Sequence, residues 1–226
     1  STGEVLVAST GVIGAPLNTD VIGKALPELV KGLSAEAVPR VVEAIMTTDS
    51  FPKLSVFEGK AGGKSYKVVG MAKGAGMIMP DMATMLCFIL TDITVDPIRL
   101  NEALVWGVER TFNRISVDGD MSTNDTVFVL ANGAAGNGTL SPEDFQRFRT
   151  GLTKVMDELS TMVVRDGEGA TKLVRISIKG AATPADALTA ARTVANSALV
   201  KTAFYGSDPN WGRIMAALGR SGIQMR

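Results

Sequence analysis

Apolar segments of two kinds alternate along this chain, and no linker, internal repeat or low-complexity tract separates them. Short runs of β-branched and other apolar residues predict strands, and longer segments with apolar residues three or four positions apart predict helices. The predicted strands cover residues 4–9, 54–57, 66–72, 85–90, 126–130 and 173–178. The predicted helices cover residues 21–33, 35–46, 96–112, 141–164, 187–204 and 211–218. This alternation predicts one α+β domain over residues 1–226, with its elements packed in layers.

Capping and turn residues mark the ends of several of these elements. Ser141, followed by Pro142 and two acidic residues, is typical of a helix start. Residues 59–64 place a glycine pair between two strand-like runs, which predicts a β-hairpin. The run at 85–90 is apolar without alternation and contains Cys87, so we expect a strand buried on both faces and an inert thiol.

The composition excludes several classes of partner. With 226 residues, 46% of them hydrophobic, the chain can bury a core of its own. Its 23 basic residues balance its 23 acidic residues, so we expect neither a nucleic-acid nor an anionic-membrane partner. No apolar run reaches the ~18 residues of a membrane span, and the first twenty residues do not resemble a signal peptide. A cytoplasmic location is therefore the prediction.

The chain has no histidine and a single cysteine, which excludes much of the usual catalytic chemistry. A Ser-His-Asp triad, a histidine-ligated zinc site, an internal disulfide and a CxxC pair are all impossible. The glycines at 62–63 lack the earlier glycine of a phosphate loop, because position 58 is glutamate. Residues 118–122 resemble a calcium loop, but its twelfth position is valine instead of glutamate. We expect no metal and no cofactor.

One segment, residues 71–86, combines a lysine, two glycines and a proline ahead of Thr84, which opens the apolar run. A threonine at this point is consistent with a simple strand start, because β-branching favours strands. The absence of histidine suggests a second interpretation. A threonine at a chain terminus brings its own α-amine, with a pKa of ~8, as the base for its hydroxyl.

Five segments resemble the glutamate N-acetyltransferase (ornithine acetyltransferase) family of arginine biosynthesis, in the order in which that family carries them. They are STGVIGAPL (9–17), IMTTDSFPK (45–53), GMAKGAGMIMPDMATML (70–86), TFNRISVDGDMSTNDT (111–126) and DPNWGRIMAALGRSG (208–222). The resemblance implies a layered sandwich of β-sheets covered by α-helices, as in D-aminopeptidase and ornithine acetyltransferase. It also implies a precursor that cuts itself between Ala83 and Thr84 into pieces 1–83 and 84–226. The resemblance further implies that the family's N-terminal and C-terminal regions are missing from this sequence.

The resemblance further implies roles for individual residues. Thr84 would be the nucleophile that carries the acetyl group from N-acetylornithine to glutamate in a ping-pong reaction. Thr10 and Gly11 would form the oxyanion hole. No cofactor is implied, although acetyl-CoA could serve as a second acetyl donor.

The same family pattern places substrate contacts at Thr47, Lys73, Thr84 and Glu168. Lys73 would bind a substrate carboxylate, and Glu168 a substrate ammonium group. Each has a simpler alternative as a solvated side chain. Thr47 would offer a hydroxyl contact, with Thr48 as a rival.

Two other functions stay open. A D-aminopeptidase-like hydrolase would keep the nucleophile and replace glutamate by water, and an uncleaved scaffold would leave Thr84 inert. The expected partners are small amino-acid substrates, with the two cleavage products associated as a heterotetramer or larger. In a eukaryote the location would be mitochondrial.

Overall fold

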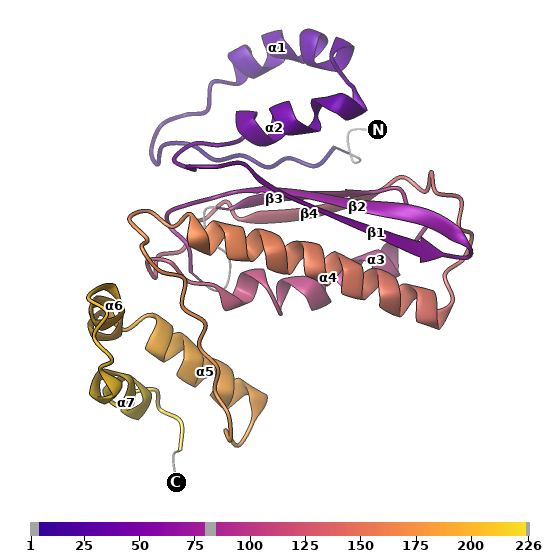
Figure 1. Ribbon diagram of the computed structural model, residues 1–226. Helices are drawn as coiled ribbons and strands as arrows, with labels where there is room; N and C mark the ends of the chain where they lie inside the picture. The colour runs from indigo at the N-terminus through magenta and orange to yellow at the C-terminus, as the bar shows by residue number, and fades with distance from the viewer. Residues whose placement is uncertain (1–4, 80–84, 225–226) are drawn as a thin grey trace.

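The computed structural model describes residues 5–79 and 85–224, and its centre is a four-stranded mixed sheet (Figure 1). The strand order is β1-β2-β3-β4, antiparallel between β1 and β2 and between β2 and β3, and parallel between β3 and β4. The strands are β1 (Lys53–Ala61), β2 (Lys64–Lys73), β3 (Leu86–Thr91) and β4 (Thr126–Ala131). Because parallel neighbours need a crossover connection, α3 (Pro97–Val108) lies between β3 and β4 in the chain.

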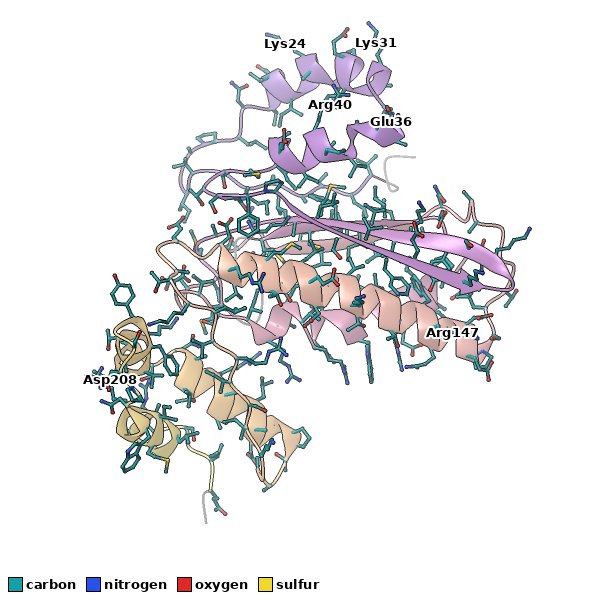
Figure 2. The ribbon with its side chains drawn as sticks, viewed as in Figure 1. Lys24, Lys31, Glu36, Arg40, Arg147 and Asp208 are labelled. Atoms are coloured by element: carbon teal, nitrogen blue, oxygen red, sulfur yellow. The ribbon has the colours of Figure 1, made fainter. Side chains whose placement is uncertain are left out.

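The other helices surround this sheet or follow it in the chain. They are α1 (Thr19–Lys31), α2 (Val38–Ala44), α4 (Pro142–Arg165), α5 (Pro184–Ala195), α6 (Ala198–Tyr205) and α7 (Trp211–Gly219), with short 3-10 turns η2 (Ala35–Ala37) and η3 (Phe112–Arg114). Helices α3 and α4 cover one side of the sheet, and α1 and α2 lie on the other (Figure 1). No residue of α1 is buried, and Lys24 and Lys31 point away from the sheet (Figure 2).

Helix α4 forms the main core with the sheet. Ser141 caps it by accepting the Asp144 amide hydrogen, and Pro142 occupies the first turn, as predicted. Its buried residues recur every three or four positions, which is the spacing of one helix face. They include Phe148, Leu152, Val155, Met156, Leu159 and Val163.

Two glycines let α4 lie close to the strands. A Cβ on Gly151 would stand 2.2 Å from Cε1 of Phe57 in β1, and one on Gly70 would stand 2.5 Å from Cγ1 of Val155. In the predicted hairpin, Ala61 pairs with Lys64, and the intervening glycines have φ of +54° and +74°. Both values favour glycine, so the glycine pair serves as a tight hairpin turn.

Helices α5, α6 and α7 form a second, smaller apolar cluster around Val194, Val200 and Ala217. Hydrogen bonds connect it to the loop after η3, where Lys201 Nζ donates to the Val117 carbonyl oxygen. Figure 1 shows this cluster set apart from the sheet.

Two predicted strands are wrong. Residues 5–9 form no strand, and Val5, Leu6 and Val7 are 69%, 57% and 79% exposed instead of buried. Residues 173–178 are also without strand structure and are largely exposed. An apolar or alternating segment forms a strand only when another strand is available to hydrogen-bond with it. Among the described residues, neither segment pairs with a strand.

The single helix predicted over 187–204 is also wrong, because the structure divides it into α5 and α6. Asn196 ends α5, and the Ser197 side chain accepts the Val200 amide hydrogen to begin α6. A serine that bonds to the backbone in this way offers an alternative to continuing the helix. The other predicted helices and strands are present, with ends shifted by a few residues.

Candidate active site

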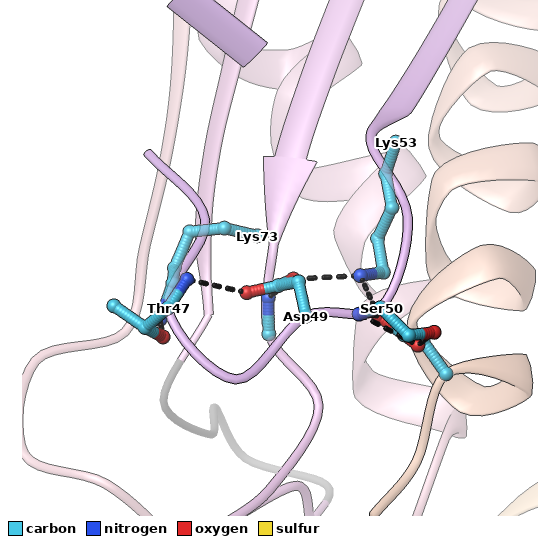
Figure 3. Close-up of polar contacts among 7 residues, drawn as sticks. Thr47, Asp49, Ser50, Lys53 and Lys73 are labelled. Atoms are coloured by element: carbon cyan, nitrogen blue, oxygen red, sulfur yellow. Dashed lines mark hydrogen bonds and ion pairs between the residues drawn. The ribbon is translucent and has the colours of Figure 1, made fainter. Parts of the chain in front are cut away.

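A buried ion cluster lies where the loop after α2, the start of β1 and the end of α4 meet. Lys53, the first residue of β1, places its Nζ 2.6 Å from Oδ1 of Asp49 and 2.5 Å from Oδ2 of Asp166 (Figure 3). The Lys53 side chain is fully buried, as is that of Asp49, and that of Asp166 is only 2% exposed. Buried charges are tolerated when they are paired and hydrogen-bonded, and this cluster meets both conditions.

Asp49 ties the loop after α2 to the end of β2. Its Oδ1 accepts the Gly74 amide hydrogen at 2.7 Å, and its Oδ2 accepts the Thr47 amide hydrogen at 3.1 Å. Burial by itself raises the pKa of Asp49, but the hydrogen bonds from Gly74 and Lys53 outweigh it, and the pKa lies below its ordinary value. The carboxylate is therefore ionised and holds the loop in one position.

Lys73, the last residue of β2, is buried and points at this loop. Its side-chain Nζ donates to Oγ1 of Thr47 at 2.8 Å, and the residue is only 3% exposed. Burial lowers the pKa of Lys73, and the nearby Lys53 acts in the same direction. The alternative of a solvated surface lysine is wrong, and the structure brings together two of the predicted substrate-binding residues, Thr47 and Lys73.

Glu168 lies on the loop after α4, close to the chain that follows Lys73. Its amide nitrogen donates to the Ala75 carbonyl oxygen at 2.8 Å. A Cβ on Gly76 would stand 2.9 Å from the Glu168 carboxyl carbon, so a larger residue at this position would require the Glu168 side chain to shift. Glu168 is exposed, and this agrees equally with a substrate contact and with the alternative of a solvated loop glutamate.

Ala83 and Thr84 lie outside the described residues, and the next residue in the chain, Met85, is held on both sides. Its amide nitrogen donates to Oδ1 of Asp125 at 2.7 Å, and its carbonyl oxygen accepts the Thr126 amide hydrogen at 3.0 Å. The β2–β3 register pairs Lys73 with Leu86. Met85, which precedes Leu86, therefore lies beside the end of β2.

Asp125 is an unusual carboxyl group. Its Oδ2 is buried and has no hydrogen-bond partner among the residues that the structure describes. Burial raises the pKa of Asp125 to about 7, although the Met85 amide and the positive charge of Lys73 act in the opposite direction. A carboxyl group in this range can hold or release a proton near neutral pH.

The proposed oxyanion residues lie on a loop that contacts the start of β4. Nδ2 of Asn124 donates to the carbonyl oxygen of Ser9 at 3.0 Å. Because Ser9 precedes Thr10 and Gly11, and Asn124 precedes Asp125, this bond brings the proposed oxyanion residues near the carboxyl group that accepts from the Met85 amide. Thr10 is partly buried and Gly11 is exposed.

Among the described residues, we find neither a cluster of metal ligands nor an accessible thiol. In the ranges 5–79 and 85–224, no three acidic or cysteine side chains are grouped to hold a metal ion. The carboxylate of Asp118, in the calcium-like segment, instead accepts the amide hydrogens of Met77 and Ile78. Cys87 is buried, which raises the pKa of its thiol.

None of the described helices is both long and apolar enough to cross a membrane.

Sequence patterns assigned no role to Asp49, Lys53, Asp125 and Asp166. The first two lie in the segment 45–53 and Asp125 lies in the segment 111–126, and both segments carry the family resemblance. Their place in these two segments was the only sequence signal that could have indicated a role for Asp49, Lys53 and Asp125. Nothing in the sequence indicated that Asp166 lies against Lys53, 113 positions away.

The fold and site define a layered α+β protein with a buried, charged site at one end of a mixed sheet. The chain belongs to the ArgJ family, whose model matches residues 1–226, and this confirms the resemblance seen in its motifs.

Several known proteins are similar to this chain. It is 54% identical over 224 residues to the arginine biosynthesis bifunctional protein ArgJ of Geobacter sulfurreducens, covering 98% of this chain and 57% of that protein. It is 50% identical over 222 residues to the glutamate N-acetyltransferase of Methanocaldococcus jannaschii, covering 97% of this chain and 55% of that protein. The chain thus spans a little over half the length of these curated relatives.

A solved structure supports the fold. The crystal structure of the arginine biosynthesis bifunctional protein ArgJ from Bacillus halodurans matches with a TM-score of 0.59 and 47% sequence identity. The match covers 62% of this chain and 66% of that chain. The predicted α+β class is confirmed.

Proposed function

We propose that this chain carries the catalytic site of an acetyltransferase of arginine biosynthesis, which moves an acetyl group from N-acetylornithine to glutamate. The names of its relatives support this reaction, since one of them is a glutamate N-acetyltransferase. The observation that carries the proposal is the convergence of Thr47, Lys73 and the Glu168 loop at the end of the sheet where β2 ends and Met85 precedes β3.

The charges of these residues complement the substrate. N-acetylornithine has one carboxylate and, after a flexible chain, one ammonium group. Lys73 supplies a cation for the carboxylate, with the Thr47 hydroxyl beside it, and Glu168 supplies an anion for the ammonium. Because Lys73 is already buried, binding the carboxylate requires little further desolvation of the lysine.

Thr84 would become the nucleophile by self-cleavage. Its hydroxyl attacks the Ala83 carbonyl carbon, the peptide nitrogen leaves as an amine, and the resulting ester is hydrolysed by water. The freed α-amine of Thr84 then accepts the hydroxyl proton when the oxygen attacks the acetyl group. Ornithine leaves, and the glutamate amine takes the acetyl group from the threonine ester. Thr10 and Gly11 would stabilise the oxyanion formed in each step.

The sheet supplies a reason for the two pieces, 1–83 and 84–226, to stay together after cleavage. Strand β2 belongs to the first piece and β3 to the second, and they pair antiparallel over six residues. Helix α4 of the second piece also packs on β1 and β2 of the first. Cleavage thus leaves the core joined by strand hydrogen bonds and apolar contacts.

The test uses the full-length protein with N-acetylornithine, with and without glutamate. We expect ornithine release that depends on glutamate, and a second N-terminal sequence beginning Thr-Met-Leu-Cys-Phe. Thr84→Ala should leave the chain uncut and inactive, and the exposed Thr150→Ala is the matched control. Ornithine release without glutamate would instead identify a hydrolase, and a single uncut chain with no activity would identify a scaffold.

A further inference from the structure

Three segments that carry the proposed substrate contacts meet at one buried lysine. Lys53 bonds to Asp49, which in turn accepts the amide hydrogens of Thr47 and Gly74. The loop with Thr47 and the strand end with Lys73 are thus attached to the same carboxylate (Figure 3).

The third segment is attached through the second carboxylate. Asp166 accepts from Lys53 Nζ at 2.5 Å and from the Ser50 amide at 3.0 Å, and the Ser50 hydroxyl also donates to it. Asp166 ends α4 and lies two residues before Glu168. The single ammonium group of Lys53 therefore joins the loop after α2, the end of β2 and the start of the Glu168 loop.

We propose that Lys53 is a positioning residue that sets the spacing between the carboxylate-binding pair Thr47–Lys73 and the ammonium-binding Glu168. This inference rests on the proposed function. The Lys53 side chain is completely buried and its ammonium group is engaged by the carboxylates of Asp49 and Asp166, so we assign it no contact with the substrate. A displacement of about 1 Å between groups that bind the two ends of a substrate can cost up to about a hundredfold in rate at subsaturating substrate.

The contribution should be specific to substrate binding. Met85, the residue after the proposed nucleophile in the sequence, is held by hydrogen bonds to Asp125 and Thr126, and neither bond involves Lys53. Loss of the Lys53 charge would release the loops that carry Thr47 and Glu168 and leave the hydrogen bonds of Met85 in place. Self-cleavage, which needs no bound substrate, should then continue.

The experiment compares Lys53→Met and Lys53→Arg with wild type in the full-length protein. The matched control is Lys67→Met, which removes an exposed ion pair to Glu58 in the same sheet. For Lys53→Met we expect KM for N-acetylornithine to rise at least about tenfold, with kcat and the self-cleavage rate within about threefold of wild type. Lys53→Arg should have an intermediate KM, and the control should match wild type.

A folded Lys53→Met protein with the KM of wild type would overturn the proposal, as would an equal loss of kcat and self-cleavage. Should Lys53→Met not fold, Lys53→Arg decides: a raised KM with unchanged kcat supports the proposal, and an unchanged KM overturns it.

Hydrogen exchange separates this inference from the proposed function. In the Lys53 variants, the amides of 47–50, 73–75 and 166–168 should all exchange at least about tenfold faster, because all three segments lose the same anchor. Faster exchange confined to 49–53 would overturn the positioning role. A wild-type protein that transfers no acetyl group would refute the proposed function, while this exchange pattern would still report whether Lys53 joins the three segments.

Discussion

The free energy of unfolding should fall as the pH rises from 5 to 8, because Asp125 stays protonated in the folded state at pH values where it is ionised in the unfolded chain. Replacing Asp125 with asparagine should abolish this decrease. The folded state keeps this carboxyl group protonated up to a pKa of about 7, because burial opposes its ionisation. In the unfolded chain the group ionises near pH 4. Between these values the folded state binds one more proton, so raising the pH favours unfolding.

The magnitude follows from the width of that window. From pH 5 to pH 7 the folded state holds the extra proton over two pH units, at about 1.4 kcal/mol each, or about 3 kcal/mol in total. Above pH 7 the contribution stays constant, since the group is then ionised in both states. This chain contains no histidine, and comparison with Asp125→Asn cancels the titration of every other group that the two proteins share.

The assay is urea unfolding of the full-length protein at pH 5 and pH 8, in a Thr84→Ala background that prevents a new α-amine from forming. Asparagine keeps an oxygen for the Met85 amide hydrogen and cannot ionise. The free energy of unfolding of the parent should fall by about 3 kcal/mol more than that of Asp125→Asn across this range. Asp120→Asn, at an exposed position nearby, is the control. Equal pH dependence in the parent and Asp125→Asn would refute the burial argument.

Three further outcomes are expected. Gly151→Ala should lower the free energy of unfolding by about 1–3 kcal/mol, because its Cβ would stand 2.2 Å from Phe57, whereas Gly23→Ala in the exposed α1 should raise it by about 0.5–1 kcal/mol. Urea titrations measure both, and similar values for the two would contradict the packing argument. Cys87 should not react with an aromatic disulfide reagent until the protein is unfolded, and rapid labelling of the native state would show that the thiol is accessible. Lys73→Met should raise KM for N-acetylornithine by about ten- to a hundredfold, and initial-rate kinetics that leave KM unchanged would remove Lys73 from the carboxylate site.

Most helices and the central strands were predictable because their signals are local. The Ser141 cap, the apolar stripe of α4 and the glycine pair of the hairpin each act within a few residues. The strands predicted at 4–9 and 173–178 failed because strand formation depends on a neighbouring edge, which no local pattern specifies. The division of α5 from α6 depends on whether the Ser197 side chain caps the new helix or faces away from it.

For the candidate site, the resemblance to the family implies which residues contact substrate, and these roles stay predictions; the structure adds the arrangement of the described residues. Thr47 and Lys73 lie in contact, although one follows a helix and the other ends a strand. The burial of Lys73 contradicts only the simpler alternative of a solvated surface lysine, which is the usual state of a lysine side chain. Ala83, Thr84 and the cleavage that would free the nucleophile stay predictions.

The sequence by itself determined the class of the fold, the family and the absence of histidine from this chain, because periodicity, motifs and residue counts depend only on the order and number of the residues. Only the tertiary structure decided which charges share the interior. Lys53 and Asp166 are 113 positions apart, and Asp125 meets Met85 across 40 positions. Such pairs form because a buried charge is stable only beside an opposite charge or a hydrogen-bond donor, and folding determines which groups come within reach.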